Sequence, residues 1–196
     1  MKKLVLATTV LGIMATTSAQ AEPKFFTQAD LGVTSLRFHD HGESFHKNVF
    51  SQRLSGGLDF QNGNRLSLGF THYGRITKDY YDATAKEFGD VYSEKMKFDT
   101  YDIGVGYTYT IPLNFPVRPY VGARMGMSIA KSKHEAYAVG YSASHTHTDN
   151  RFSFGGLAGV EYDIMPNLAV GIGAEYNRLN SYLNAFSGNG FLRYTF

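Results

Sequence analysis

The segment Tyr101–Tyr109 alternates strictly between two kinds of residue. Every odd position carries a tyrosine or an aliphatic side chain, and the even positions carry Asp102, Gly104, Gly106 and Thr108. This period of two predicts a β-strand whose two faces contact different surroundings. The segment Val117–Ile129 repeats the pattern. Each segment has about the length, roughly 9–11 residues, at which a tilted strand crosses a bilayer.

Six further segments alternate in the same way, and the connections between all eight differ in length. The other predicted strands are Phe25–Leu36, Phe50–Phe60, Arg65–Arg75, Phe152–Ile164, Leu168–Tyr176 and a last one ending at Phe196. Polar loops are expected at Phe38–Asn48, Ile76–Lys95 and Lys131–Asn150, with a shorter one at Asn177–Ala185. The other connections are short, and one contains Asn62-Gly63, a strong hairpin signal. Such sorting of long and short loops is typical of outer-membrane barrels. We therefore predict an all-β fold, an eight-stranded antiparallel up-and-down transmembrane β-barrel.

Alternation alone does not say whether the apolar face is directed outward to lipid or inward to the barrel interior. A soluble lipocalin-like barrel would turn its apolar face inward. In this chain the polar face consists mostly of glycine and serine with isolated charges, which suits a narrow interior. The apolar face carries aromatic residues at its ends, as at a membrane–water boundary. We expect the apolar face to contact lipid. Burial of Val105, Val121 and Ile172 against one another would refute this.

The first 21 residues have the three parts of a secretory signal peptide. Lys2 and Lys3 precede an apolar run, and Ala19-Gln20-Ala21 forms a cleavage site. The alternative, a membrane-spanning helix, needs a longer apolar run. Residues 22–196 would then form the barrel, with the formal net charge reduced from +2 to zero. This balance gives no reason to expect a nucleic-acid partner, and the absence of cysteine excludes disulfides.

Charged residues recur on the predicted inward face, with both signs nearly balanced. They are Asp30, Arg53, Asp59, Arg65, Asp102, Arg118, Arg124, Glu161, Asp163, Glu175 and Arg193. Paired carboxylates and arginines are compatible with catalysis or an ion path. The simpler interpretation is a network that fills the lumen, where each charge must be paired and hydrogen-bonded. We expect Arg124 to pair with Glu161 or Glu175 at the centre.

Most of the histidines fall in two predicted loops: His39, His41 and His46 in the first, and His134, His145 and His147 in the third. Imidazoles bind zinc, copper or nickel, and they become charged together below about pH 6.5. The spacing matches no strong zinc motif. A solvated loop without metal is the alternative, and the sequence predicts no cofactor.

The last strand places Leu192, Tyr194 and Phe196 on the lipid face. This resembles the C-terminal signal by which barrel-insertion machinery recognises outer-membrane proteins. The alternative is a chain that ends by coincidence in an aromatic strand.

Taken together, residues 22–196 resemble the opacity-protein family, or opacity-type porins, of Gram-negative outer membranes. The similarity lies in the strand pattern, the loop order, Pro116–Gly126 (PVRPYVGARMG), Phe154–Ile164 (FGGLAGVEYDI) and the closing LRYTF. The resemblance implies an outer-membrane barrel with extracellular loops and periplasmic termini. In several members these loops bind host surface molecules.

Three functions follow as hypotheses. The first is a rigid scaffold that displays loops for adhesion to host surface proteins. The predicted loop at Thr77–Lys97 mixes charges with Tyr80, Tyr81, Phe88 and Tyr92, which suits protein binding or contact with the barrel rim. The second is a small passive pore. The third, an enzyme acting on lipid, would need a nucleophile with a base and an orienting acid. His72 beside Thr71 is not such a site, because neighbours on a strand point to opposite faces, so we predict no enzyme.

Overall fold

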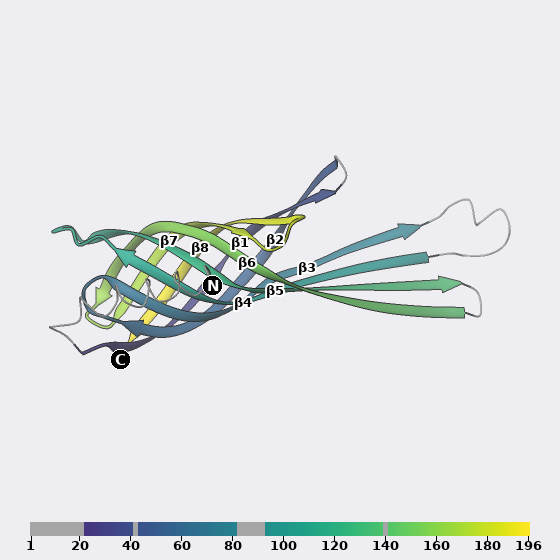
Figure 1. Ribbon diagram of the computed structural model, residues 1–196. Helices are drawn as coiled ribbons and strands as arrows, with labels where there is room; N and C mark the ends of the chain where they lie inside the picture. The colour runs from purple at the N-terminus through teal and green to yellow at the C-terminus, as the bar shows by residue number, and fades with distance from the viewer. Residues whose placement is uncertain (1–21, 41–42, 82–92, 139–140) are drawn as a thin grey trace, which may run out of the picture.

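The computed structural model describes residues 22–40, 43–81, 93–138 and 141–196. Within these ranges eight antiparallel strands form a closed barrel, in which each strand pairs with its neighbours in the chain and β1 pairs with β8 (Figure 1). The strands are β1 Lys24–Asp40, β2 Glu43–Asp59, β3 Asn64–Tyr81, β4 Ser93–Thr110, β5 Val117–Ala138, β6 Tyr141–Met165, β7 Leu168–Arg178 and β8 Leu183–Thr195. No helix in the described residues is apolar and long enough to span a membrane. The predicted barrel is confirmed, whereas the predicted signal peptide lies outside the described residues.

The apolar face of the strands is the outside of the barrel. Val105, Val121 and Ile172 are 45%, 47% and 65% exposed, while Arg124 and Glu175 are only 8% and 2% exposed. The charged residues therefore lie inside, and the arrangement expected of a soluble barrel is excluded. An apolar exterior of this kind is stable only against hydrocarbon.

The three long loops predicted from the sequence begin too early and end too late, because the strands continue into each of them from both sides. Pairing between β1 and β2 extends to Asp40↔Glu43, between β3 and β4 to Tyr81↔Ser93, and between β5 and β6 to Ala138↔Tyr141. These outer parts were assigned to loops because they lack apolar alternation. A hairpin that has left the membrane has water on both faces, so its sequence is polar throughout.

Strands β3 to β6 project together beyond the barrel as one four-stranded sheet (Figure 1). Pairing of β3 with β2 ends at Gln52↔His72, and pairing of β6 with β7 ends at Phe154↔Arg178. We call the projecting part, residues 77–81, 93–97, 131–138 and 141–148, the four-stranded extension. It leaves the barrel as a continuation of the same hydrogen-bonded ladder.

A β-bulge marks the point where β3 leaves the barrel. The register between β3 and β4 shifts between His72 and Arg75, and Gly74 there has a φ of +73°. This left-handed conformation favours glycine. The extra residue reverses the facing of the strand, so that Arg75 is exposed and Ile76 is buried.

Candidate functional site in the barrel lumen

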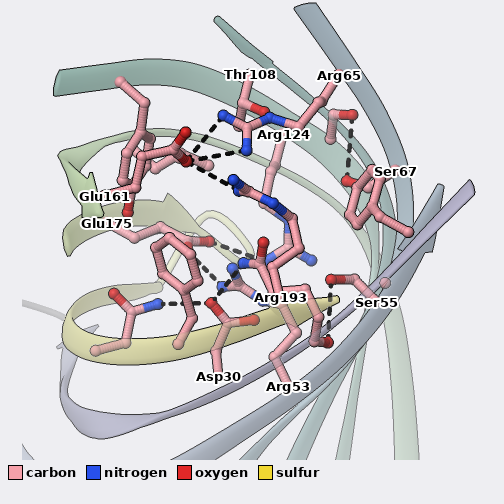
Figure 2. Close-up of a pocket in the computed structure, with 18 of the residues that line it drawn as sticks. Asp30, Arg53, Ser55, Arg65, Ser67, Thr108, Arg124, Glu161, Glu175 and Arg193 are labelled. Atoms are coloured by element: carbon pink, nitrogen blue, oxygen red, sulfur yellow. Dashed lines mark hydrogen bonds and ion pairs between the residues drawn. The ribbon is translucent and has the colours of Figure 1, made fainter. Parts of the chain in front are cut away.

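Glu161 lies at the centre of a first charge layer (Figure 2). It lines the same cavity as residues of the short turns, so this layer is near that end of the barrel. Its Oε2 accepts hydrogen bonds from Arg65 and Arg193, each at 2.9 Å. Its Oε1 accepts from Arg118 at 3.1 Å and from the Thr110 hydroxyl at 3.2 Å. Four different strands thus converge on one carboxylate that is 2% exposed. Three guanidinium groups share this single buried negative charge.

Glu175 is the centre of a second layer, deeper in the barrel. It accepts hydrogen bonds from Arg53, from Arg124 at 2.9 Å and from the Asn177 amide. Arg124 also donates to Asp102 at 3.3 Å, and Asp102 accepts a further bond from Ser153. Every carboxylate of this layer therefore has partners on other strands, as a buried charge requires.

Between the two layers lies a cavity of about 50 Å³. Asp30 points into this region and accepts bonds from Gln28 at 3.0 Å and Asn189 at 3.3 Å. Among the described residues, its other oxygen Oδ2 and the Nε of Arg65 have no hydrogen-bond partner. A polar cavity of this size has room for a few water molecules and is too small to be an open path.

An apolar cap closes the lumen above the second layer. It consists of Leu36, Val49, Tyr73, Ile76, Leu179, Leu183 and Ala185, with Phe98 packed against it. The Tyr73 hydroxyl accepts a hydrogen bond from Asn177 at 3.0 Å and so connects the cap to the Glu175 layer. Leu179 is completely buried, and its carbonyl accepts a bond from Ser128.

This cap was not predicted from the sequence. Leu183 and Ala185 were assigned to a loop at Asn177–Ala185, but the connection between β7 and β8 comprises only residues 179–182. The signal was present in the alternation, because Leu36 shares its strand face with Asp30, and Leu183 shares its strand face with Arg193. Ile76 could not be found in this way, because the bulge at Gly74 reverses the face.

At the turn end the lumen opens into a funnel of about 640 Å³, lined among others by Asp59, Asp163 and Phe196. The funnel ends at Glu161 and its three arginines. A solute entering from this end would meet the first charge layer, then the second, and then the apolar cap. In the part of the chain that the structure describes, the interior is filled rather than open.

The predicted inward charges divide between these layers and the rim. Arg124 pairs with Glu175, whereas Glu161 pairs with Arg65, Arg118 and Arg193 and not with Arg124. Asp163 is 47% exposed and bonds to Arg118 at 2.6 Å. Asp59 stays at the turn, where its carboxylate accepts the Gln61 backbone N–H at 2.8 Å, so it is not part of either layer.

Five of the six histidines predicted to lie in loops lie on strands instead. His39, His46 and His134 belong to β1, β2 and β5, while His145 and His147 are exposed on β6. His41 lies outside the described residues. Within the described ranges no group of three histidine or acidic side chains could hold a metal ion.

The four-stranded extension contains one ion cluster of its own. Lys133 and Lys97 donate to Glu135 at 2.7 and 3.0 Å. These hydrogen bonds lower the pKa of Glu135 from its ordinary 4.5 to about 2. The cluster ties β4 to β5 beyond the barrel.

On the last strand, Leu192, Tyr194 and Phe196 are exposed on the outer surface. The Tyr194 and Phe196 rings meet edge to face at 5.1 Å between centroids, and the Phe196 N–H donates to the Phe25 carbonyl at 2.8 Å. This strand closes the barrel against β1.

Comparison with protein families gives a match to the Opacity family porin protein over residues 56–196. A Haemophilus influenzae protein of unassigned function is 30% identical over 196 residues, covering the whole of both chains. The opacity protein opA67 of Neisseria gonorrhoeae is 23% identical over 177 residues, which cover 74% of this chain and 76% of that protein.

Among solved structures, the fold is similar to neisserial surface protein A, with a TM-score of 0.61 and 23% identity over 88% of this chain and 97% of that one. It is also similar to Ail, the attachment invasion locus protein of Yersinia pestis, solved in complex with the heparin analogue sucrose octasulfate. That match has a TM-score of 0.55 and 16% identity, and it covers 88% of this chain and 99% of the other. At these identities the similarity concerns the fold alone.

Proposed function

The chain belongs to the Opacity family of porin proteins, and from this premise we propose that it is a surface adhesin whose barrel is a closed scaffold. It is an outer-membrane barrel with eight strands. The proposal concerns what this barrel does in the membrane, and it assigns the binding role to the paired strands that project from it.

The filled lumen supports a scaffold over a passive pore. Two layers of paired charges and an apolar cap follow one another along the barrel axis. Moving an ion through them would require breaking several buried ion pairs, and a buried charge that loses its partner is costly in free energy. A pore that conducts steadily would instead need a continuous polar path.

The observation that carries the proposal is the four-stranded extension. Its strands remain paired to their tips, where Tyr81, Ser93 and Tyr137 occupy one row across β3, β4 and β5. Tyr141 on β6 lies beside this row, paired with Ala138. Tyrosine is enriched in protein–protein interfaces, because it offers a large, rigid contact surface with a polar end. A sheet held out from the membrane in this way suits contact with another cell.

Adhesion requires that the extension faces outward. We therefore place the projecting hairpins outside the cell, with the short turns and both termini in the periplasm. Cleavage after Ala21 would release residues 22–196 for export, and Leu192, Tyr194 and Phe196 would be read by the barrel-insertion machinery. Ail, a fold relative named for attachment, is compatible with this role.

The test is to remove the extension without disturbing the barrel. In one variant residues 77–97 are deleted, joining the register partners Ile76 and Phe98, and in another residues 130–149 are deleted, joining Ile129 and Asn150. An Asn-Gly pair closes each hairpin. Cells that display the variants are scored for adhesion to cultured epithelial cells. We expect adhesion to fall to background in at least one of the two.

The matched control exchanges residues 112–116, at the opposite end of the barrel, for a glycine–serine linker of equal length. It should adhere like the unmodified protein. Surface level and the heat-modifiable gel shift confirm that each variant is inserted and folded. Full adhesion by both deletion variants would refute the proposed role.

A further inference from the structure

Strands β7, β8 and β1 form one flank of the barrel, on the side opposite to the extension's central strands in the pairing order (Figure 1). Arg37 of β1 and Arg178 of β7 are both in register with the same residue of β8, Asn184. One step nearer the short turns, Ser35 and Tyr176 are both in register with Phe186. The first three residues form an upper row in which every side chain is polar or charged. The other three form a lower row in which two of the side chains are aromatic.

A groove of about 260 Å³ lies at these two rows, lined by Ser35, Arg37, Tyr176, Asn184 and Phe186. Adjacent strands are about 4.8 Å apart, so the backbones of Arg37 and Arg178 flank Asn184 at about 10 Å from each other. Two arginine side chains can therefore reach one group bound over β8.

Among the described residues, the upper row forms no ion pair and contains one buried acceptor without a hydrogen bond. Within the described part of the chain, neither Arg37 nor Arg178 has an acidic partner. The Oδ1 of Asn184 is buried and, among the described residues, accepts no hydrogen bond. Exposed arginines elsewhere differ in this respect: Arg75 pairs with Asp99, and Arg151 pairs with Asp149.

Below the groove, two successive outward positions of β8 are glycines. Gly188 and Gly190 face outward between β1 and β7, where Val33, Leu31 and Ile172 are 58%, 57% and 65% exposed. A Cβ added at Gly188 would meet nothing within 4 Å. The two glycines therefore leave a shallow trough, walled by apolar side chains, that runs from Phe186 toward the middle of the lipid-facing surface.

We propose that this flank binds one phosphorylated lipid from the leaflet on the side of the extension. Arg37 and Arg178 hold the headgroup phosphate, because guanidinium groups bind phosphate in a bidentate manner. Rotation of the Asn184 amide about its Cβ–Cγ bond brings the buried Oδ1 to the surface, where it accepts from a hydroxyl, amide or ammonium next to that phosphate. One acyl chain lies over Gly188 and Gly190. The site is independent of the adhesive role and of the extension.

The position of the groove favours a lipid over a soluble anion. The upper row lies where the outward residues change from apolar to charged, which is the level of lipid headgroups, and the trough lies within the apolar band. A free phosphate would use only the upper row. A lipid would use both.

The test is native mass spectrometry of the full chain in detergent micelles, titrated with diphosphorylated lipid A. We expect the protein to retain at least one bound lipid A, and the double variant Arg37→Gln/Arg178→Gln to bind it about tenfold or more weakly. Gly188→Leu should also weaken binding by filling the trough, while leaving both charges in place. The control Arg151→Gln removes an exposed arginine outside the groove and should bind like the parent.

Two comparisons of ligands complete the test. Enzymatically dephosphorylated lipid A should bind the parent protein as weakly as lipid A binds the double variant. Glucosamine 1-phosphate, which lacks acyl chains, should not compete at matched concentrations. Unchanged lipid A binding by the double variant or by Gly188→Leu, equal binding of dephosphorylated lipid A, or competition by the sugar phosphate would each overturn the proposal.

Discussion

The barrel and the four-stranded extension are built from the same strands, yet they are stabilised differently. Inside the barrel, each strand separates lipid from a sealed interior, and the interior depends on a few buried carboxylates such as Glu161 and Glu175. In the extension both faces meet water, and the ion pairs that hold it, such as Lys133–Glu135, lie near the surface. One continuous ladder of backbone hydrogen bonds thus runs from the lipid-embedded barrel into the water-exposed extension. Substitutions should therefore cost far more within the barrel than beyond it.

The largest effect is expected at Glu161. Glu161→Ala leaves Arg65, Arg118 and Arg193 without their shared acceptor. Breaking a buried ion pair costs about 3–5 kcal/mol, so the free energy of unfolding should fall by about that amount. Urea titration of the protein refolded in lipid vesicles measures it.

Asp163→Ala is the matched control, because Asp163 also bonds to Arg118 but is half exposed. It should cost under about 1 kcal/mol. A loss at Glu161 no greater than at Asp163 would remove the distinction between the sealed layer and the rim.

The apolar cap gives the next largest effect. Leu36 is 1% exposed, and Leu36→Ala should lower the free energy of unfolding by about 2–5 kcal/mol, since it opens a cavity. Leu31→Ala, on the lipid face of the same strand, removes an equal volume where Leu31 is 57% exposed and leaves no cavity. In the same urea titration, Leu31→Ala should lower the free energy of unfolding clearly less than Leu36→Ala does. Equal costs would mean that the cap is not closely packed.

Gly74, at the junction between barrel and extension, should show an intermediate effect. In Gly74→Ala the new Cβ would stand 2.6 Å from the Phe50 carbonyl oxygen, at a φ of +73° that disfavours alanine. We expect the free energy of unfolding to fall by about 1–3 kcal/mol, as measured by thermal unfolding. Gly188→Ala serves as the control, because its Cβ meets nothing within 4 Å. Were the two variants equally stable, the bulge would not constrain the junction.

The smallest effect concerns the pH response of the extension. The pKa of Glu135 is about 2 in the folded protein and 4.5 ordinarily. Because the folded value is the lower one, the cluster stabilises fully above pH 4.5 and loses its contribution as the pH falls toward 2. A side-chain NMR titration of Glu135 should show its midpoint near pH 2. A midpoint near pH 4.5 would show that Lys133 and Lys97 do not lower the pKa of Glu135.

The same contrast explains what the sequence could predict. Alternation reported the barrel correctly wherever a strand separates lipid from the interior, as at Val105 and Asp102. It failed for β5 and β6 beyond Ile129, because a strand with water on both faces has no apolar period. The inward charges were found by the same alternation, and one of the two partners predicted for Arg124, Glu175, is correct. The pairing of Glu161 with Arg65 and Arg193 was not predicted, since these residues meet only through closure of the barrel. Alternation also gives the wrong face for the residues after Gly74, because the β-bulge there moves Ile76 to the inner face.

The central claim is that the barrel is closed from end to end by its charge layers and cap. Conductance of the purified protein in planar lipid bilayers tests this most directly, with insertion verified by the heat-modifiable gel shift. The account predicts silent membranes at all applied voltages. Reproducible open levels in proportion to the amount of inserted protein would contradict it and would favour the passive pore.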